Sequence, residues 1–147
     1  MIQVRTKEDL KNVKTNLSGS YKLMNDIDLQ GENWEPIGAE KNPFKGTLDG
    51  NGFVIKNLTI NKSEQKGVGL FSYVEDAKII NITLENPRVK GHERTAGLIG
   101  SGKGSSIENS HIKKKGQITG NNYIGGIIGL GENIRIIGCS ATDSIIK

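Results

Sequence analysis

The segment Thr95-Ala96-Gly97-Leu98-Ile99-Gly100 recurs with small changes at two other places in this chain. A later copy, Tyr-Ile-Gly-Gly-Ile-Ile-Gly, occupies 123–129, and a looser, earlier version, Gly-Val-Gly-Leu-Phe-Ser, occupies 67–72. The central glycines of the three copies, Gly69, Gly97 and Gly126, are evenly spaced to within a single position. A fixed period of this kind is typical of repeat architectures, in which each repeat is one structural unit that packs on its neighbours.

The segments between the glycine motifs keep the same period. Ile79, Ile107 and Ile136 have the same spacing as the three glycines, and each begins a short run that the period repeats. No helical pattern of ten residues fits between these runs, which excludes a sheet built from strand–helix–strand units. We therefore expect coils of three short strands each, stacked in parallel, with the three isoleucines in one interior ladder.

Further ladders are expected from the same period. Leu70, Leu98 and Ile127 fall one period apart and should form a second apolar ladder. The segment 56–60, Lys-Asn-Leu-Thr-Ile, returns as 80–84, Ile-Asn-Ile-Thr-Leu, which predicts a polar ladder at a corner of the coil. Its members are expected to be Asn57, Asn81 and Asn109. Four glycines should permit close backbone approach where a Cβ atom would clash, namely Gly97, Gly100, Gly126 and Gly129.

Length and composition are those of one modest domain. The chain has 147 residues, 34% hydrophobic residues and 20 glycines, too many glycines for a helical protein. Cys139 is the single cysteine, so an internal disulfide framework is excluded. Met1 is followed directly by polar residues with no apolar leader, so we expect a cytoplasmic protein, or a surface or secreted one if the chain is a fragment.

The first twenty residues are predicted to cap the coils. Thr6 is a suitable N-cap for a short helix with acidic residues in its first turn. Leu10, Val13 and Leu17 then lie on one helical face, which we expect to cover the open N-terminal end of the stack. The whole chain is thus one domain, with a cap at 1–20 and coils at 21–147.

Several longer motifs resemble those of the GLUG-motif repeat family. They are Tyr-Lys-Leu-Met-Asn-Asp-Ile-Asp-Leu at 21–29, Trp-Glu-Pro-Ile-Gly at 34–38, Pro-Phe-Lys-Gly-Thr-Leu-Asp-Gly-Asn-Gly at 43–52, and the glycine repeats. The resemblance covers roughly residues 2–147. It implies an all-β, right-handed parallel β-helix, here of about four to five coils. Such repeats are similar to those of bacterial surface proteins, including adhesins and IgA-protease-type peptidases, where they serve as a stalk or binding surface.

No constellation of side chains indicates catalysis, a metal or a cofactor. Asp26, Asp28 and Asp49 could form a carboxylate pair of the glycosidase kind, but each lies in a turn where Asp bonds its own backbone. His92 and His111 fall at different phases of the repeat, so they should not stack into a metal site. We expect a protein that is not an enzyme and that needs no cofactor.

A cluster of basic residues, which we call the basic edge, falls on two successive coils. It consists of Arg88, Lys90, Arg94, Lys113, Lys114 and Lys115. The period places Lys113 over Glu85, so part of the cluster could be an ordinary solvated charge ladder. The other interpretation is a site for an acidic or nucleic-acid-associated protein partner.

The chain stops directly after a strand, with no helix to cover the last coil. Apolar ladder residues and unpaired backbone groups should therefore be exposed there, at Ile136, Ile137, Ile145 and Ile146. We expect a homodimer through this end, or a partner docked on it, and no contact with a membrane.

These features favour non-enzymatic protein–protein recognition through a β-helix surface. One hypothesis is a small intracellular phage-type inhibitor that docks on a nucleic-acid-handling defence complex such as a CRISPR effector. The alternative is an N-terminal repeat fragment of a secreted adhesin or IgA-protease-type surface peptidase. A carbohydrate-binding or polysaccharide-cleaving β-helix is a third hypothesis.

Overall fold

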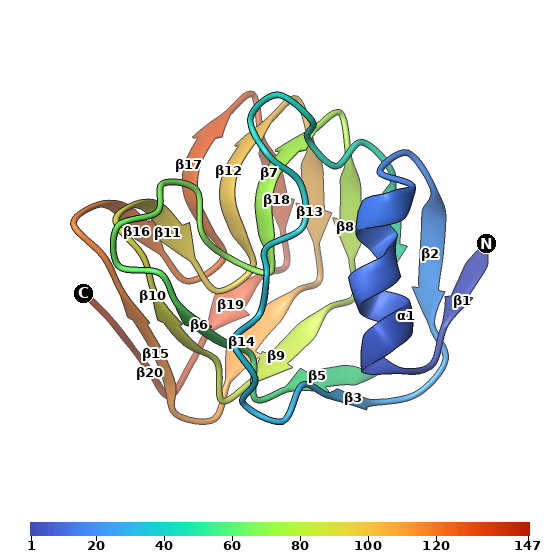
Figure 1. Cartoon of the computed structure of the whole chain (residues 1–147), viewed down its shortest axis with the longest axis horizontal. Helices are drawn as coiled ribbons and strands as arrows, with labels where there is room; N and C mark the ends of the chain where they lie inside the picture. Colours follow the sequence, from blue (N-terminus) through green and yellow to red (C-terminus); the bar gives the residue numbers. More distant parts are fainter.

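The computed structural model describes all residues 1–147 as one stack of parallel β coils (Figure 1). The stack makes about four turns, so the predicted parallel β-helix is confirmed. All strand pairs are parallel, and partners lie about one period apart along most of the stack. The sequence prediction of three strands per coil was too low, because the two most regular coils have five each.

The strands of the early coils are β1 (Ile2–Val4), β2 (Ser20–Leu23), β3 (Ile27–Asp28), β4 (Thr47–Asp49), β5 (Val54–Lys56), β6 (Thr59–Asn61) and β7 (Phe71–Glu75). The first regular coil comprises β8 (Lys78–Ile80), β9 (Thr83–Glu85), β10 (Arg88–Lys90), β11 (Glu93–Ala96) and β12 (Ile99–Lys103). The second comprises β13 (Ser106–Glu108), β14 (His111–Lys113), β15 (Gly116–Thr119), β16 (Asn122–Gly125) and β17 (Ile128–Glu132). The last, partial coil comprises β18 (Arg135–Ile137), β19 (Ser140–Ala141) and β20 (Ser144–Ile146).

Five parallel sheets run along the stack, one for each strand position of the coil. Their orders are β1-β2-β4-β8-β13-β18, β3-β5-β9-β14-β19, β6-β10-β15-β20, β11-β16 and β7-β12-β17. Side chains that point inward from these sheets, from the corners between them and from the N-terminal helix form a single core cluster of 28 buried residues. Outward side chains form the flat faces of the stack.

The predicted apolar ladders are present. Ile107 pairs in register with Ile79 on one side and with Ile136 on the other. The same ladder continues toward the N-terminus through Leu48, Tyr21 and Ile2. The second ladder is also formed, since Phe71, Ile99 and Ile128 are in register and Leu70, Leu98 and Ile127 directly precede them in the chain.

The predicted asparagine ladder needs a correction, because the structure has two such ladders. Asn109 donates its amide to Asn81 at 2.9 Å, and Asn81 donates to Asp49 at 3.0 Å. Asn57 belongs to the other ladder, in which Asn86 donates to it and it donates to Asp28, both at 3.0 Å. The register of β5 on β9 shows the reason, since Lys56 pairs with Glu85 and this brings Asn57 against Asn86 instead of Asn81.

The asparagines occupy corners that few other residue types tolerate. Asn57, Asn81, Asn86 and Asn109 all have positive φ, between 46° and 60°. Asparagine adopts this left-handed region more readily than most residues, and its amide then bonds along the stack. Asparagine therefore sets the bend of the coil and also links one coil to the next.

The glycines of the repeated motif are required by close contacts, as predicted. A Cβ atom at Gly100 would lie 2.6 Å from the Val68 nitrogen, and one at Gly129 would lie 2.6 Å from the Tyr123 oxygen. Neither glycine has positive φ. Their role is to let neighbouring backbones approach, and any side chain there would collide with main-chain atoms.

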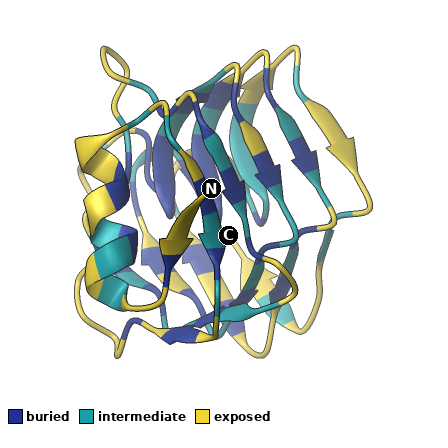
Figure 2. Ribbon diagram, turned by 90° about the vertical axis from the view of Figure 1, so that its right-hand side faces the viewer, coloured by how far each residue is buried: buried dark blue, intermediate teal, exposed yellow.

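The two ends of the stack differ (Figure 2). At the N-terminal end, helix α1 (Lys7–Lys11) continues into the 3₁₀ helix η1 (Asn12–Thr15), and Thr6 caps it through a reciprocal pair of bonds with Asp9. Leu10 and Val13 are fully buried and join the core cluster, which confirms the predicted cap. The last coil has no such cover, and its strand β18 is exposed along its length.

Candidate functional site

The structure separates the basic edge into three places. Arg88 and Lys90 lie on β10 with their side chains outward, and Lys113 ends β14. Lys114 and Lys115 form the corner that follows β14, both with positive φ, at 58° and 62°. Arg94 lies on β11 and belongs to a different hollow, so it does not join the others.

Arg88 and Lys90 lie on a polar surface, which we call the basic face. It is built from the outward residues of β6, β10 and β15, which are Thr59, Asn61, Arg88, Lys90, Gln117 and Thr119. Two adjoining hollows of about 220 and 250 Å³ lie on this face, and both are lined by Thr59 and Arg88. Neither hollow is lined by a carboxylate. Arg88 donates to the Gln117 side chain at 3.2 Å, which holds the guanidinium along the sheet.

The corner lysines are partly neutralised. Lys113 lies in register with Glu85, as the period predicted, and Lys114 forms an ion pair with Glu85 at 3.4 Å. Lys113 and Lys115 form no ion pair, and neither do Arg88 and Lys90. One carboxylate therefore lies among several cations, and the excess positive charge remains beside the basic face.

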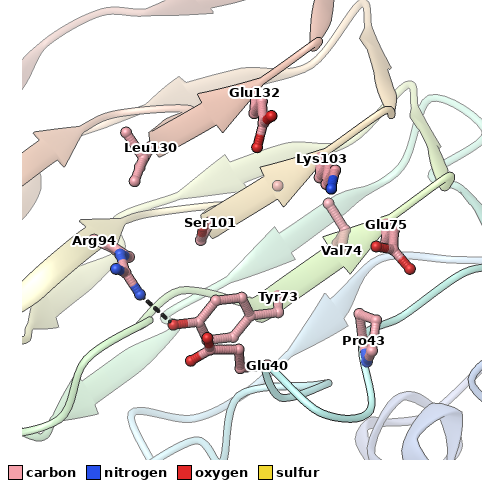
Figure 3. A pocket seen from close by; sticks show the side chains of 11 residues that line it. Glu40, Pro43, Tyr73, Val74, Glu75, Arg94, Ser101, Lys103, Leu130 and Glu132 are labelled. Carbon is pink, nitrogen blue, oxygen red and sulfur yellow. Dashed lines mark hydrogen bonds between the residues drawn. The ribbon is translucent and has the colours of Figure 1, made fainter.

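Arg94 lines a separate hollow of about 380 Å³, which we call the Arg94 groove (Figure 3). Its floor is the outward side of β7, β12 and β17, where Tyr73, Ser101 and Leu130 are in register. A second row alternates in charge through Glu75, Lys103 and Glu132. Glu40 and Pro43 close one side of the groove.

The Arg94 side chain is fixed by one short hydrogen bond. Its Nη1 donates to the Tyr73 hydroxyl at 2.7 Å, and this bond raises the pKa of Arg94 above its ordinary value, with Glu40 adding a smaller contribution. Its Nε is buried without a hydrogen-bond partner. Arg94 also has φ of 56°, a conformation that is uncommon for a non-glycine residue. The guanidinium is thus held charged at the groove with donor capacity left over.

Sequence reasoning did not find the Arg94 groove. The signal was present in the period, because Tyr73, Ser101 and Leu130 follow one another at the spacing of the glycine motif. A small residue between two large ones in an outward ladder leaves a hollow. The bond between Arg94 and Tyr73 joins two different strand positions, and no period relates them.

The residues considered for catalysis or metal binding have structural roles. Asp28 accepts bonds from the Asn57 amide and then from the Gln30 backbone, and these lower its pKa. Asp26 and Asp49 accept backbone bonds from Val54 and Asn51. No group of three or more His, Cys, Asp or Glu side chains is arranged to hold a metal ion.

The last coil exposes the four isoleucines that the sequence singled out. Ile136, Ile137, Ile145 and Ile146 are between 40% and 52% exposed. Ile136 and Ile146 end inward ladders, above Ile107 and Ile118, so their exposure comes from the open end of the stack. Ile137 and Ile145 point outward, in register with polar residues of the coil below.

Comparison with known proteins agrees with this architecture. The GLUG motif matches residues 120–146, which run from the end of β15 through β20. The last part of this chain therefore contains a GLUG motif. The resemblance seen in the sequence is therefore confirmed, and the matched residues include the third copy of the glycine motif.

Two relatives of this GLUG-motif chain are much longer than it is. Halomucin of Haloquadratum walsbyi is 35% identical over 136 residues, which cover 84% of this chain and 2% of halomucin. A Gly-rich membrane protein of Evansella cellulosilytica is 31% identical over 129 residues, which cover 82% of this chain and 13% of the relative. The chain thus spans a small part of either relative. No solved structure matches the chain. None of its helices has the length and hydropathy to cross a bilayer.

Proposed function

We propose that this GLUG-motif chain is a non-enzymatic binding module that recognises an acidic partner through its basic face. The observation that carries the proposal is the pair of adjoining hollows around Arg88, which are lined by cations, amides and hydroxyls and by no carboxylate. Such a surface attracts negative charge and offers donors to hydrogen-bond it. The donors lie on strands that pair on both sides of β10, which holds them in place before the partner arrives.

Two cellular roles are compatible with such a face. The Gly-rich membrane protein relative supports a module displayed at the cell surface, with an acidic polymer or acidic protein as the partner. The intracellular role, a phage-type inhibitor docked on a nucleic-acid-handling complex such as a CRISPR effector, draws its support from the positive charge alone. Similarity to the relatives makes the surface role the better supported of the two.

Charge reversal on the basic face tests the proposal. The double variant Arg88→Glu, Lys90→Glu should bind a heparin column or a poly-glutamate surface about tenfold more weakly than the parent chain, equivalent to about 1.4 kcal/mol. Binding of the parent should also weaken as salt is raised. The control variant Lys14→Glu, Lys78→Glu has the same net charge, with both changes away from this face. Equal weakening of binding in both variants would show that net charge alone explains the loss of affinity, and would overturn the proposal.

We also propose that the open face of the last coil receives a second copy of this chain, end to end. An occupant must supply strands at several faces of the coil at once and apolar residues over Ile136 and Ile146, and a second copy of the same face does both. The capped N-terminal end cannot pair in this way, so the contact closes as a twofold dimer. Sedimentation should show a dimer that Ile136→Glu dissociates. A parent chain that stays monomeric at high concentration would refute this contact.

A further inference from the structure

The Arg94 groove lies on a different sheet from the basic face and has a different chemistry. On its floor, Tyr73 of β7, Ser101 of β12 and Leu130 of β17 lie in register on three neighbouring strands. Neighbouring strands are about 4.8 Å apart, so Tyr73 and Leu130 stand about 9.6 Å apart across Ser101. Gly102, next to Ser101, also lines the hollow. A ring-shaped group can therefore rest on the small residues between two larger side chains.

The polar groups around this slot are of mixed kind. Arg94 supplies a permanent cation whose direction is set by its bond to the Tyr73 hydroxyl. Lys103 forms no ion pair, although Glu75 and Glu132 lie in register on either side of it. The Glu75 carboxylate is instead paired with Lys45 at 3.4 Å. The Ser101 hydroxyl forms no hydrogen bond within the protein.

This arrangement selects among ligand classes. A simple anion would meet Glu40, Glu75 and Glu132 as well as the two cations. A purely apolar ligand would leave Arg94 and Lys103 without partners. A ring bearing several hydroxyls satisfies both kinds of group, since a hydroxyl donates to a carboxylate and accepts from Lys or Ser. One carboxylate on the ring would then meet Arg94 as a charge-assisted pair. The volume of about 380 Å³ lies at the small end of the range for small-molecule sites.

We infer that the Arg94 groove binds a carboxylated sugar ring, a hexuronate or the uronate unit of an acidic polysaccharide. The carboxylate accepts from Arg94, the ring lies over Ser101 beside the Tyr73 side chain, and its hydroxyls bond to Lys103 and Glu132. The site is independent of the basic face, because no residue lines both. A protein with this second site recognises a specific unit in a polymer that the basic face alone would bind only by its charge.

The test follows the backbone amide NMR resonances of the protein during titration with glucuronate, glucose or acetate. Glucuronate should shift the resonances of Tyr73, Ser101 and Lys103 with a dissociation constant on the order of millimolar. Glucose, which lacks the carboxylate, and acetate, which lacks the ring, should each bind about tenfold more weakly or not at all. Equal shifts with glucuronate and acetate, or shifts confined to Arg88, Lys90 and Gln117, would overturn the assignment. If the shifts are confined to the basic face, the proposed function of that face would stand and the assignment of the Arg94 groove would fail.

Two variants distinguish the contribution of the Arg94 guanidinium to glucuronate binding from that of the shape of the slot. Arg94→Asn removes the guanidinium and keeps a residue that tolerates positive φ, so the fold should persist while glucuronate affinity falls about tenfold. Ser101→Leu fills the slot from an outward position and should abolish the shifts without removing any charge. Arg88→Asn is the matched control on the other sheet and should leave the titration unchanged. Unaltered glucuronate affinity in folded Arg94→Asn would refute the inference.

Discussion

Truncation of one isoleucine ladder at two heights gives a quantitative test of the stack. Ile107 is fully buried between Ile79 and Ile136, whereas Ile136 ends the same ladder and is 48% exposed. Ile107→Ala removes three buried carbons, worth about 2.5 kcal/mol at about 0.8 kcal/mol each, and leaves an enclosed cavity. With the cavity included, we expect a total loss of about 4 kcal/mol. At protein concentrations low enough to keep the chain monomeric, Ile136→Ala removes the same atoms from a half-exposed site with no enclosed cavity and should cost about 1 kcal/mol.

Urea unfolding measures both losses with a probe already in the chain. Trp34 is buried, and its Nε1 donates to the Leu70 carbonyl at 3.1 Å, so its fluorescence reports the folded stack. Far-UV circular dichroism provides a second probe and shows whether the last coil unfolds separately. The difference of about 3 kcal/mol corresponds to roughly 10 °C in melting temperature for a chain of this size. Equal losses at Ile107 and Ile136 would contradict the reasoning, because the two differ only in what lies above them.

Three further substitutions test the corners and close contacts. Asn81→Gly keeps the positive φ and loses the amide bonds, so it should cost about 1–2 kcal/mol in urea unfolding, and Asn81→Ala should cost about 1 kcal/mol more because alanine is strained there. Gly100→Ala places a Cβ against the Val68 nitrogen and should cost about 3 kcal/mol or prevent folding, seen as a lost melting transition. The Asn57 amide, followed by the Gln30 backbone, lowers the pKa of Asp28, so its stabilisation is present above the unfolded value near pH 4 and disappears as pH falls through the folded value. In Asp28→Asn, the free energy of unfolding should therefore fall less steeply below about pH 4 than in the parent chain. The same pH dependence in both proteins would contradict this assignment.

The repeat period predicted the stacked parallel coils and the apolar ladders, and the family resemblance implied the right-handed β-helix. The even spacing of Ile79, Ile107 and Ile136 in the sequence becomes their vertical register in the structure. The side chains of those residues point inward. Core packing tolerates few substitutions there, so the period remains visible in the sequence. The exposure of Ile136 and Ile146 followed from the same reasoning, since they are the last members of their ladders within these 147 residues.

The error in the asparagine ladder has a physical origin. Asn81 and Asn86 lie in one coil and bend the chain at two different corners, with nearly the same φ. A short motif of asparagine followed by a β-prone run therefore marks a type of corner and not a position in the coil. Aligning Asn57 with Asn81 by motif placed it on the wrong ladder, and its true partner is Asn86.

The candidate sites were predictable only in part. Arg88 and Lys90 alternate with buried Val89 on one strand, so their outward direction followed from the sequence. The separation of Arg94 from them did not follow, because it depends on how far the coil turns between β10 and β11. The Arg94 groove also needs the loop that contains Glu40, which belongs to the irregular first coil and has no counterpart in the repeat.

The most direct test of the stacked register is a disulfide between neighbouring coils. With Cys139→Ser to remove the native thiol, cysteines at Lys78 and Ser106 occupy paired outward positions on β8 and β13, about 4.8 Å apart. They should form a disulfide rapidly in air, with unchanged circular dichroism. Cysteines at Lys78 and Glu108 are offset along the strand and should remain reduced. Faster crosslinking of the offset pair would show that coils do not lie in this register, and both proposed surfaces would be lost with it.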